Sequence, residues 1–102
     1  ALPEGELTAI HQVLEPYQQD GIEFHALRTR QSGARRFVSM HVLVPGDWNV
    51  QKGHELVENI EAEIRTKLNH VTVFTHLEPL DDPVSWEDIS LDRNGSTKIP
   101  SI

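Results

Sequence analysis

Six histidines in 102 residues are the main chemical signal of this sequence. Histidine is the commonest metal ligand in proteins, because its neutral imidazole nitrogen binds transition-metal ions. The chain has no cysteine, so disulfides and thiolate metal sites are both excluded. A metal site here would use imidazole and carboxylate ligands. That set suits Zn²⁺ and also accepts Cd²⁺, Co²⁺, Mn²⁺ or Fe²⁺.

Two of the histidines lie on segments predicted to form a β-hairpin. Residues 22–30 and 36–44 both alternate apolar and polar side chains, which is typical of strands. The polar, glycine-containing segment 31–35 between them has the length of a hairpin loop. The segment is therefore expected to turn the chain back on itself, with the two strands antiparallel.

This loop would place His25 directly opposite His41. Cross-strand partners have Cβ atoms ~5 Å apart, close enough for two imidazoles to share an ion. The same register pairs Phe24 with Val42 on the opposite face, so one alignment serves both the core and the histidine pair.

The remaining histidines are spread along the chain. His76 and Glu78 are two residues apart on a predicted strand and should share a face, as a histidine–carboxylate ligand pair would. His54 lies near the start of a predicted helix, at the margin of its apolar stripe. His11 and His70 are expected to be ordinary surface residues. No compact motif such as His-Glu-x-x-His occurs, so the pattern alone leaves metal binding and incidental histidines as alternatives.

The elements that must position these side chains follow from the apolar periodicity. They are a helix, two strands, a second helix and a third strand, over residues 2–17, 22–30, 36–44, 50–68 and 71–78. This order predicts an α+β, ferredoxin-like or metallochaperone-like sandwich, with two helices on one face of a three-stranded sheet. The sequence predicts one domain over residues 1–80, followed by an acidic, flexible tail over residues 81–102.

Composition narrows the function classes. The formal net charge is −7, which argues against a nucleic-acid partner and is compatible with attracting cations. There is no run of 18 apolar residues and no signal-peptide pattern. The chain begins Ala-Leu-Pro, so we expect a fragment or a processed product.

Four blocks of the sequence resemble the C-terminal cytosolic domain of cation diffusion facilitators, a family of divalent-metal exporters. The first is His-Ala-Leu-Arg-Thr-Arg-Gln-Ser-Gly, residues 25–33, and the second runs over residues 37–46. The others are Gly-His-Glu-Leu at 53–56 and Val-Phe-Thr-His-Leu-Glu-Pro at 73–79. The resemblance covers roughly residues 1–88, and the predicted element order agrees with the fold of that family.

The resemblance implies a cytosolic regulatory domain of a membrane zinc efflux transporter, which forms a homodimer and is not an enzyme. The transporter's transmembrane domain would be its partner. Positions matching the family's zinc ligands are His25, His41, His54, His76 and Glu78. The family commonly has aspartate at the last position, so the bridging geometry here can differ. Metal binding would favour one arrangement of the two protomers, and affinity should fall below about pH 6.5 because ligand histidines must be neutral.

Three other interpretations remain. One is a free-standing metallochaperone. Another is an enzyme, either a small hydrolase of acylphosphatase-like shape, for which no arginine-bearing phosphate loop is evident, or a metal hydrolase using Glu78 or Glu23 as base. The third is a plain dimerisation module with incidental histidines.

Overall fold

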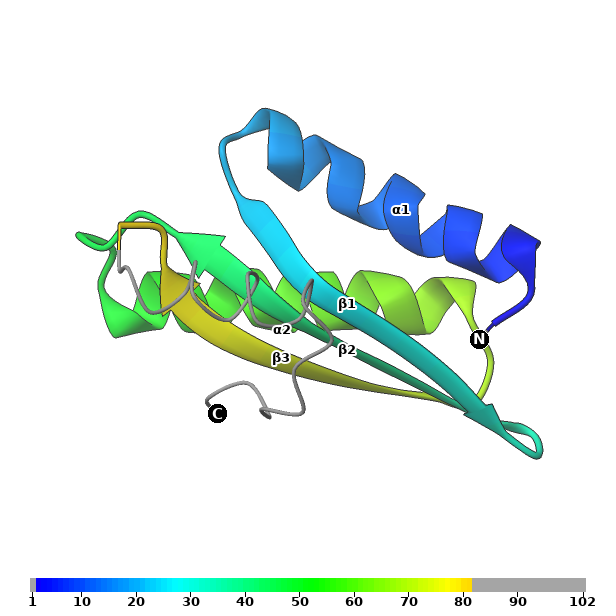
Figure 1. Cartoon of the computed structure of the whole chain (residues 1–102). Coiled ribbons are helices and arrows are strands. Elements are labelled where there is room, and N and C mark those ends of the chain that lie inside the picture. The colour runs from blue at the N-terminus through cyan, green and yellow to red at the C-terminus, as the bar shows by residue number, and fades with distance from the viewer. Residues whose placement is uncertain (1, 82–102) are drawn as a thin grey trace, which may run out of the picture.

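The structure is a computed structural model that describes residues 2–81. Two helices pack on one face of a three-stranded sheet, in the order α-β-β-α-β (Figure 1). The predicted fold class is therefore confirmed. Most of the predicted tail lies outside the described residues. Among residues 2–81, neither helix has the length and apolarity needed to cross a bilayer.

Helix α1 spans Glu4–Gln19 and helix α2 spans Val50–Lys67. The Asn49 side chain caps α2 by accepting a hydrogen bond of 2.7 Å from the backbone N–H of Lys52. Each helix buries one apolar stripe toward the sheet. The stripes are Ile10, Val13 and Leu14 in α1, and Val57, Ile60 and Ile64 in α2.

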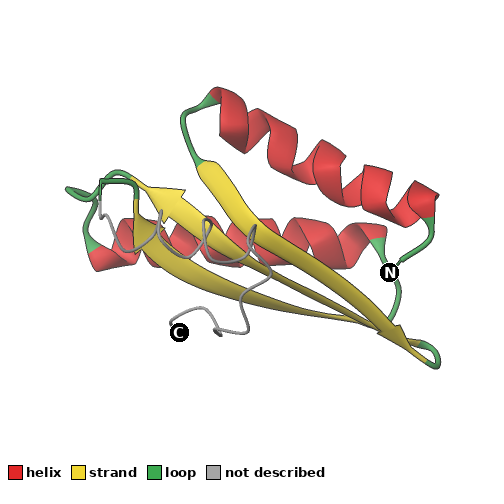
Figure 2. Ribbon diagram, in the orientation of Figure 1, coloured by secondary structure: helices red, strands yellow, loops and turns green. Residues whose placement is uncertain are grey.

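The strands are β1 (Glu23–Ser32), β2 (Arg35–Val44) and β3 (Val71–Pro79), in the spatial order β1-β2-β3. β1 runs antiparallel to β2, and β3 runs parallel to β2 because α2 returns the chain across the sheet (Figure 2). The central strand β2 carries the core of the domain. Its helix-facing residues Val38, Met40, Val42 and Val44 are all buried. We call the opposite face, which points away from both helices, the distal face.

The hairpin differs from the prediction at its tip. Ser32 pairs with Arg35, so the connection is the two-residue turn Gly33-Ala34 rather than a loop over residues 31–35. Gly33 has φ +59°, the left-handed conformation that two-residue hairpin turns require. Arg30 consequently faces Phe37, one residue away from the expected partner Arg36.

A β-bulge between His25 and Arg28 corrects this offset. Ala26 has φ +56° within the bulge, and beyond it the register returns to the predicted pairs, His25 with His41 and Phe24 with Val42. The bulge also exchanges faces. Strict alternation over residues 22–30 would put Leu27 on the face of His25 and Ala26 on the face of Phe24. Instead Leu27 packs against the core, and Ala26 lines a hollow that also includes His41.

Candidate metal centre

Three histidines form one row across the distal face. His25 on β1 pairs with His41 on β2, and His41 pairs with His76 on β3. Because side chains alternate along a strand, Glu78 lies on the same face as His76, one step further along β3. The sheet thus brings together groups that are far apart in the sequence.

Two of these histidines are directed at one carboxylate oxygen. The Nδ1 atom of His41 lies 2.9 Å from Oε2 of Glu78, and Nδ1 of His76 lies 3.0 Å from the same oxygen. The rings of His41 and His76 are nearly perpendicular, with centroids 5.2 Å apart. The distances suit hydrogen bonds but the angles do not. All three atoms are buried without a hydrogen-bond partner among the described residues.

Burial makes this arrangement costly in the absence of a ligand. The side chain of His41 is 7% exposed and that of Glu78 is 9% exposed. A buried carboxylate needs hydrogen bonds or a positive charge to offset its lost hydration. One ligand atom from each of His41, His76 and Glu78 lies within 4.8 Å of the others, and a cation placed among them would satisfy all three. Two imidazole nitrogens and a carboxylate oxygen are a normal donor set for Zn²⁺.

The other two predicted ligands lie outside this three-residue group. His25 is the cross-strand neighbour of His41, and its Nε2 atom lies 3.4 Å from Oε1 of Glu23. His54 is exposed on α2. His11 and His70, expected at the surface, are indeed exposed.

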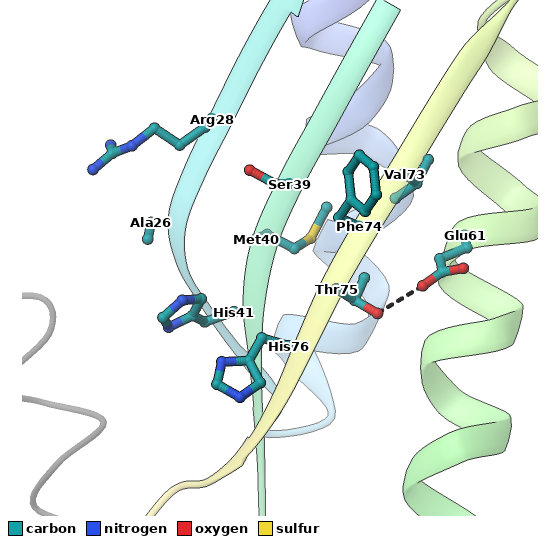
Figure 3. Close-up of a pocket in the computed structure, with 10 residues that line it drawn as sticks. All are labelled: Ala26, Arg28, Ser39, Met40, His41, Glu61, Val73, Phe74, Thr75 and His76. Atoms are coloured by element: carbon teal, nitrogen blue, oxygen red, sulfur yellow. Dashed lines mark hydrogen bonds between the residues drawn. The ribbon is translucent and has the colours of Figure 1, made fainter. Parts of the chain in front are cut away.

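A hollow of about 520 Å³ extends from this site along the sheet. Its lining includes His41, His76, Arg28, Ser39 and Phe74 (Figure 3). Arg28 was not among the predicted site residues, because the bulge that gives it this place leaves no clear sequence signal. Thr75 also lines the hollow, and its hydroxyl donates a 2.6 Å hydrogen bond to Glu61 of α2, which ties β3 to that helix.

Comparison with known proteins shows the family of the chain. Residues 2–80 match the cytoplasmic domain of cation efflux proteins. The chain is 51% identical over 87 residues to the uncharacterized transporter sll1263 of Synechocystis, and 31% identical over 81 residues to the cation-efflux pump FieF of Pectobacterium atrosepticum. It covers 28% and 26% of those proteins, so it spans about a quarter of the length of the curated relatives it matches. The chain belongs to the cation efflux protein cytoplasmic domain family.

Solved structures agree with this assignment. The metal-bound C-terminal domain of the CzcD transporter from Thermotoga maritima superimposes with a TM-score of 0.68 at 29% identity, over 79% of this chain and 98% of that one. The zinc form of CzrB superimposes with a TM-score of 0.70 at 29% identity, over 80% and 93% of the two chains.

Proposed function

We propose that this domain binds a divalent cation, with Zn²⁺ the first candidate, and thereby regulates a cation efflux transporter as a homodimer. One observation carries the proposal: two buried imidazole nitrogens converge on one buried carboxylate oxygen without making hydrogen bonds to it. A relative of the same fold is metal-bound, which supports cation binding by this domain. The relatives are transporters and pumps, so we propose no catalytic role for the domain.

His41, His76 and Glu78 would hold the ion. His25 pairs with His41 and lies next to this group, where it could complete the shell or hold a second ion with Glu78 as a shared ligand. His54, exposed on α2, would serve a site that includes a second protomer. When bound, the ion supplies positive charge that neutralises Glu78 and fixes the ring orientations of the two histidines. Measurement must decide among Zn²⁺, Cd²⁺, Co²⁺, Mn²⁺ and Fe²⁺, because this donor set accepts all of them.

The distal face is the proposed dimer surface. Phe74 lies there in β3 with 58% of its surface exposed, although it is large and apolar. Aromatic side chains are enriched in protein–protein interfaces relative to the rest of the surface. A Phe74→Glu variant should shift the domain toward the monomer in sedimentation velocity, whereas Val50→Glu, at an 85% exposed position on α2, should not. A dimer that withstands Phe74→Glu would place the interface elsewhere.

Regulation would follow from differential affinity. A metal ion that binds one arrangement of the two protomers more tightly shifts the equilibrium toward it, by no more than that difference in binding free energy. This change in the arrangement of the protomers would be transmitted to the membrane-embedded part of the transporter. The expected physiological consequence is a transport rate that responds to cytosolic metal.

The test is isothermal titration of Zn²⁺ into the metal-free domain. We expect saturable, stoichiometric binding that the His41→Ala/His76→Ala double variant abolishes. His11→Ala is the matched control, because His11 is an exposed histidine on α1 outside the site. Equal binding by the double variant and the control would refute the assignment of these ligands.

A further inference from the structure

The histidine that β1 contributes to the row has a carboxylate of its own. Glu23 and His25 are two residues apart on β1, so both side chains lie on the distal face. The bulge begins only after His25, and residues 23–25 keep regular pairing with β2. Oε1 of Glu23 lies 3.4 Å from Nε2 of His25. The proposed ligand set leaves Glu23 without a role.

The two nitrogens of His25 have different surroundings. Its Nδ1 atom is buried and makes no hydrogen bond within residues 2–81, as is also true of Nδ1 in His41 and His76. Its Nε2 atom faces the carboxylate of Glu23. A carboxylate oxygen attracts an N–H group and repels a nitrogen lone pair, so the neutral ring should carry its proton on Nε2. The lone pair is then on Nδ1, where it can bind a metal ion.

The exposure of the pair suits an outer carboxylate behind an inner imidazole. The side chain of His25 is 12% exposed, whereas that of Glu23 is 47% exposed. Glu23 therefore keeps part of its hydration and can stay charged without a metal ion beside it. Carboxylates that contact the second nitrogen of a ligand histidine fix its tautomer and its ring orientation. Their loss lowers metal affinity by roughly 10- to 100-fold.

We infer that Glu23 is a positioning residue, which holds His25 as the Nε2–H tautomer so that Nδ1 binds the ion. This inference rests on the proposed metal site and adds one residue to it. It applies whether His25 completes the shell of the first ion or serves a second one. Glu78 has the opposite place, because its carboxylate lies at the Nδ1 side of His41 and His76.

The first test measures Zn²⁺ affinity by competition with a chromophoric chelator. Glu23→Ala should lower the affinity by about tenfold or more. Glu23→Gln should recover part of the loss, because its amide oxygen can still accept a hydrogen bond from Nε2. In a His25→Ala background, Glu23→Ala should have no effect, because there is no ring left to position. Glu15→Ala is the matched control, since it removes an exposed glutamate from α1, and it should leave the affinity unchanged.

The second test identifies the nitrogen that binds the metal. Long-range ¹H–¹⁵N correlation spectra of the Zn²⁺-loaded, ¹⁵N-labelled domain distinguish a protonated ring nitrogen from a metal-bound one. We expect His25 to carry its proton on Nε2 and the metal on Nδ1. If Glu23 only stabilised the strand, its loss would act equally with and without His25 and would have no bearing on this pattern.

Three results would overturn the inference while leaving the proposed site of His41, His76 and Glu78 intact. One is equal Zn²⁺ affinity in Glu23→Ala and the parent. Another is a loss that persists in the His25→Ala background, which would make Glu23 a direct ligand or a distant charge. The third is metal bound to Nε2 of His25. Failure of Zn²⁺ to bind the parent at all would refute the proposed metal site, and the role of Glu23 with it.

Discussion

His41 and His76 are register partners on parallel strands, and their Nδ1 atoms lie 2.9 and 3.0 Å from one oxygen of Glu78. The sheet fixes this relationship, because β2 is held between β1 and β3 and has little freedom to shift. Backbone pairing therefore preorganises the group before any cation arrives. A preorganised site loses little conformational entropy on binding, which favours affinity.

Glu78 should be the most sensitive of the three proposed ligands, since both imidazoles face its carboxylate. Glu78→Gln keeps the shape but removes the charge, and we expect Zn²⁺ affinity to fall by at least about tenfold, the effect of losing even an outer-shell partner. Competition with a chromophoric chelator measures the change. Glu78→Asp keeps the charge and should retain more affinity than Glu78→Gln. The reverse order would indicate that the carboxylate charge is not what binds the ion.

Zinc should stabilise the folded domain. A ligand that binds only the folded state, at a free concentration of 100 times its Kd, adds about 2.7 kcal/mol to the free energy of unfolding. For a domain of this size the thermal midpoint should rise by on the order of 10 °C. Differential scanning fluorimetry at fixed protein concentration tests this, and addition of a chelator should reverse the shift. An equal rise in the His41→Ala/His76→Ala variant would show that the stabilising ion binds elsewhere.

Ala26 should be a position where glycine stabilises a strand. Its φ of +56° costs an L-residue about 1 kcal/mol, a cost that glycine does not have. Ala26→Gly should therefore raise the free energy of unfolding by up to about 1 kcal/mol in urea denaturation. Ala62→Gly, at an exposed position of α2, is the matched control and should lower it by about the same amount. Destabilisation by both variants would contradict the left-handed conformation of Ala26.

Gly53 and Leu77 should behave as a coupled pair. A Cβ atom at Gly53 would lie 2.5 Å from Cδ2 of Leu77, so α2 approaches β3 more closely than alanine permits without a shift of Leu77. In a Leu77→Ala background, Gly53→Ala should stabilise by about 1 kcal/mol through helix propensity. In the parent, the displacement of Leu77 should reduce or cancel that gain. A double-mutant cycle measures the difference, and strict additivity would rule out the close approach.

Acidification should weaken one link between α1 and the sheet. Glu6 accepts hydrogen bonds of 2.5 and 3.0 Å from Nε and Nη2 of Arg36, and this hydrogen-bonded guanidinium lowers the pKa of Glu6 below its usual range. A lowered folded-state pKa gives stability that is present above the unfolded-state pKa and is lost as the pH falls through the folded-state value. Glu6→Gln should therefore be less stable than the parent at neutral pH and lose less on acidification.

The thermal midpoints of Glu6→Gln and the parent, measured between neutral pH and about pH 3, should differ most at neutral pH and approach each other as the pH falls. Glu4→Gln, at an exposed position in the same turn of α1, is the matched control for the loss of a first-turn carboxylate that is not hydrogen-bonded to Arg36. Parallel curves for Glu6→Gln and the parent would exclude a role for the Glu6–Arg36 pair in acid sensitivity.

Much of the fold could be predicted from periodicity, because the apolar stripes of both helices and the alternation of β2 are regular. The pairing of His25 with His41 was predicted correctly, but from a five-residue loop where the structure has a two-residue turn, and the bulge restores the predicted alignment. The bulge was not predictable. It depends on one left-handed alanine, a conformation that alanine seldom adopts and that leaves no compositional signal.

Only part of the candidate site was predictable from the sequence. His76 and Glu78 were expected on one face, but no local pattern specifies which residue of β2 lies beside His76. Parallel register is set by how α2 packs on the sheet, and that packing includes the close contact of Gly53 with Leu77. The convergence of His41, His76 and Glu78 is therefore a tertiary property that local sequence patterns do not contain.

The parallel pairing of β2 with β3 also has a kinetic consequence. The whole of α2 lies between His41 and His76 in the sequence. The proposed ligands therefore come together only after α2 has packed on the sheet and β3 has paired with β2, which closes a long loop. Interactions that form after the rate-limiting step of folding act mainly on the reverse reaction. A bound ion would then slow the unfolding of the domain far more than it accelerates folding, and the metal-loaded state would be long-lived as well as stable.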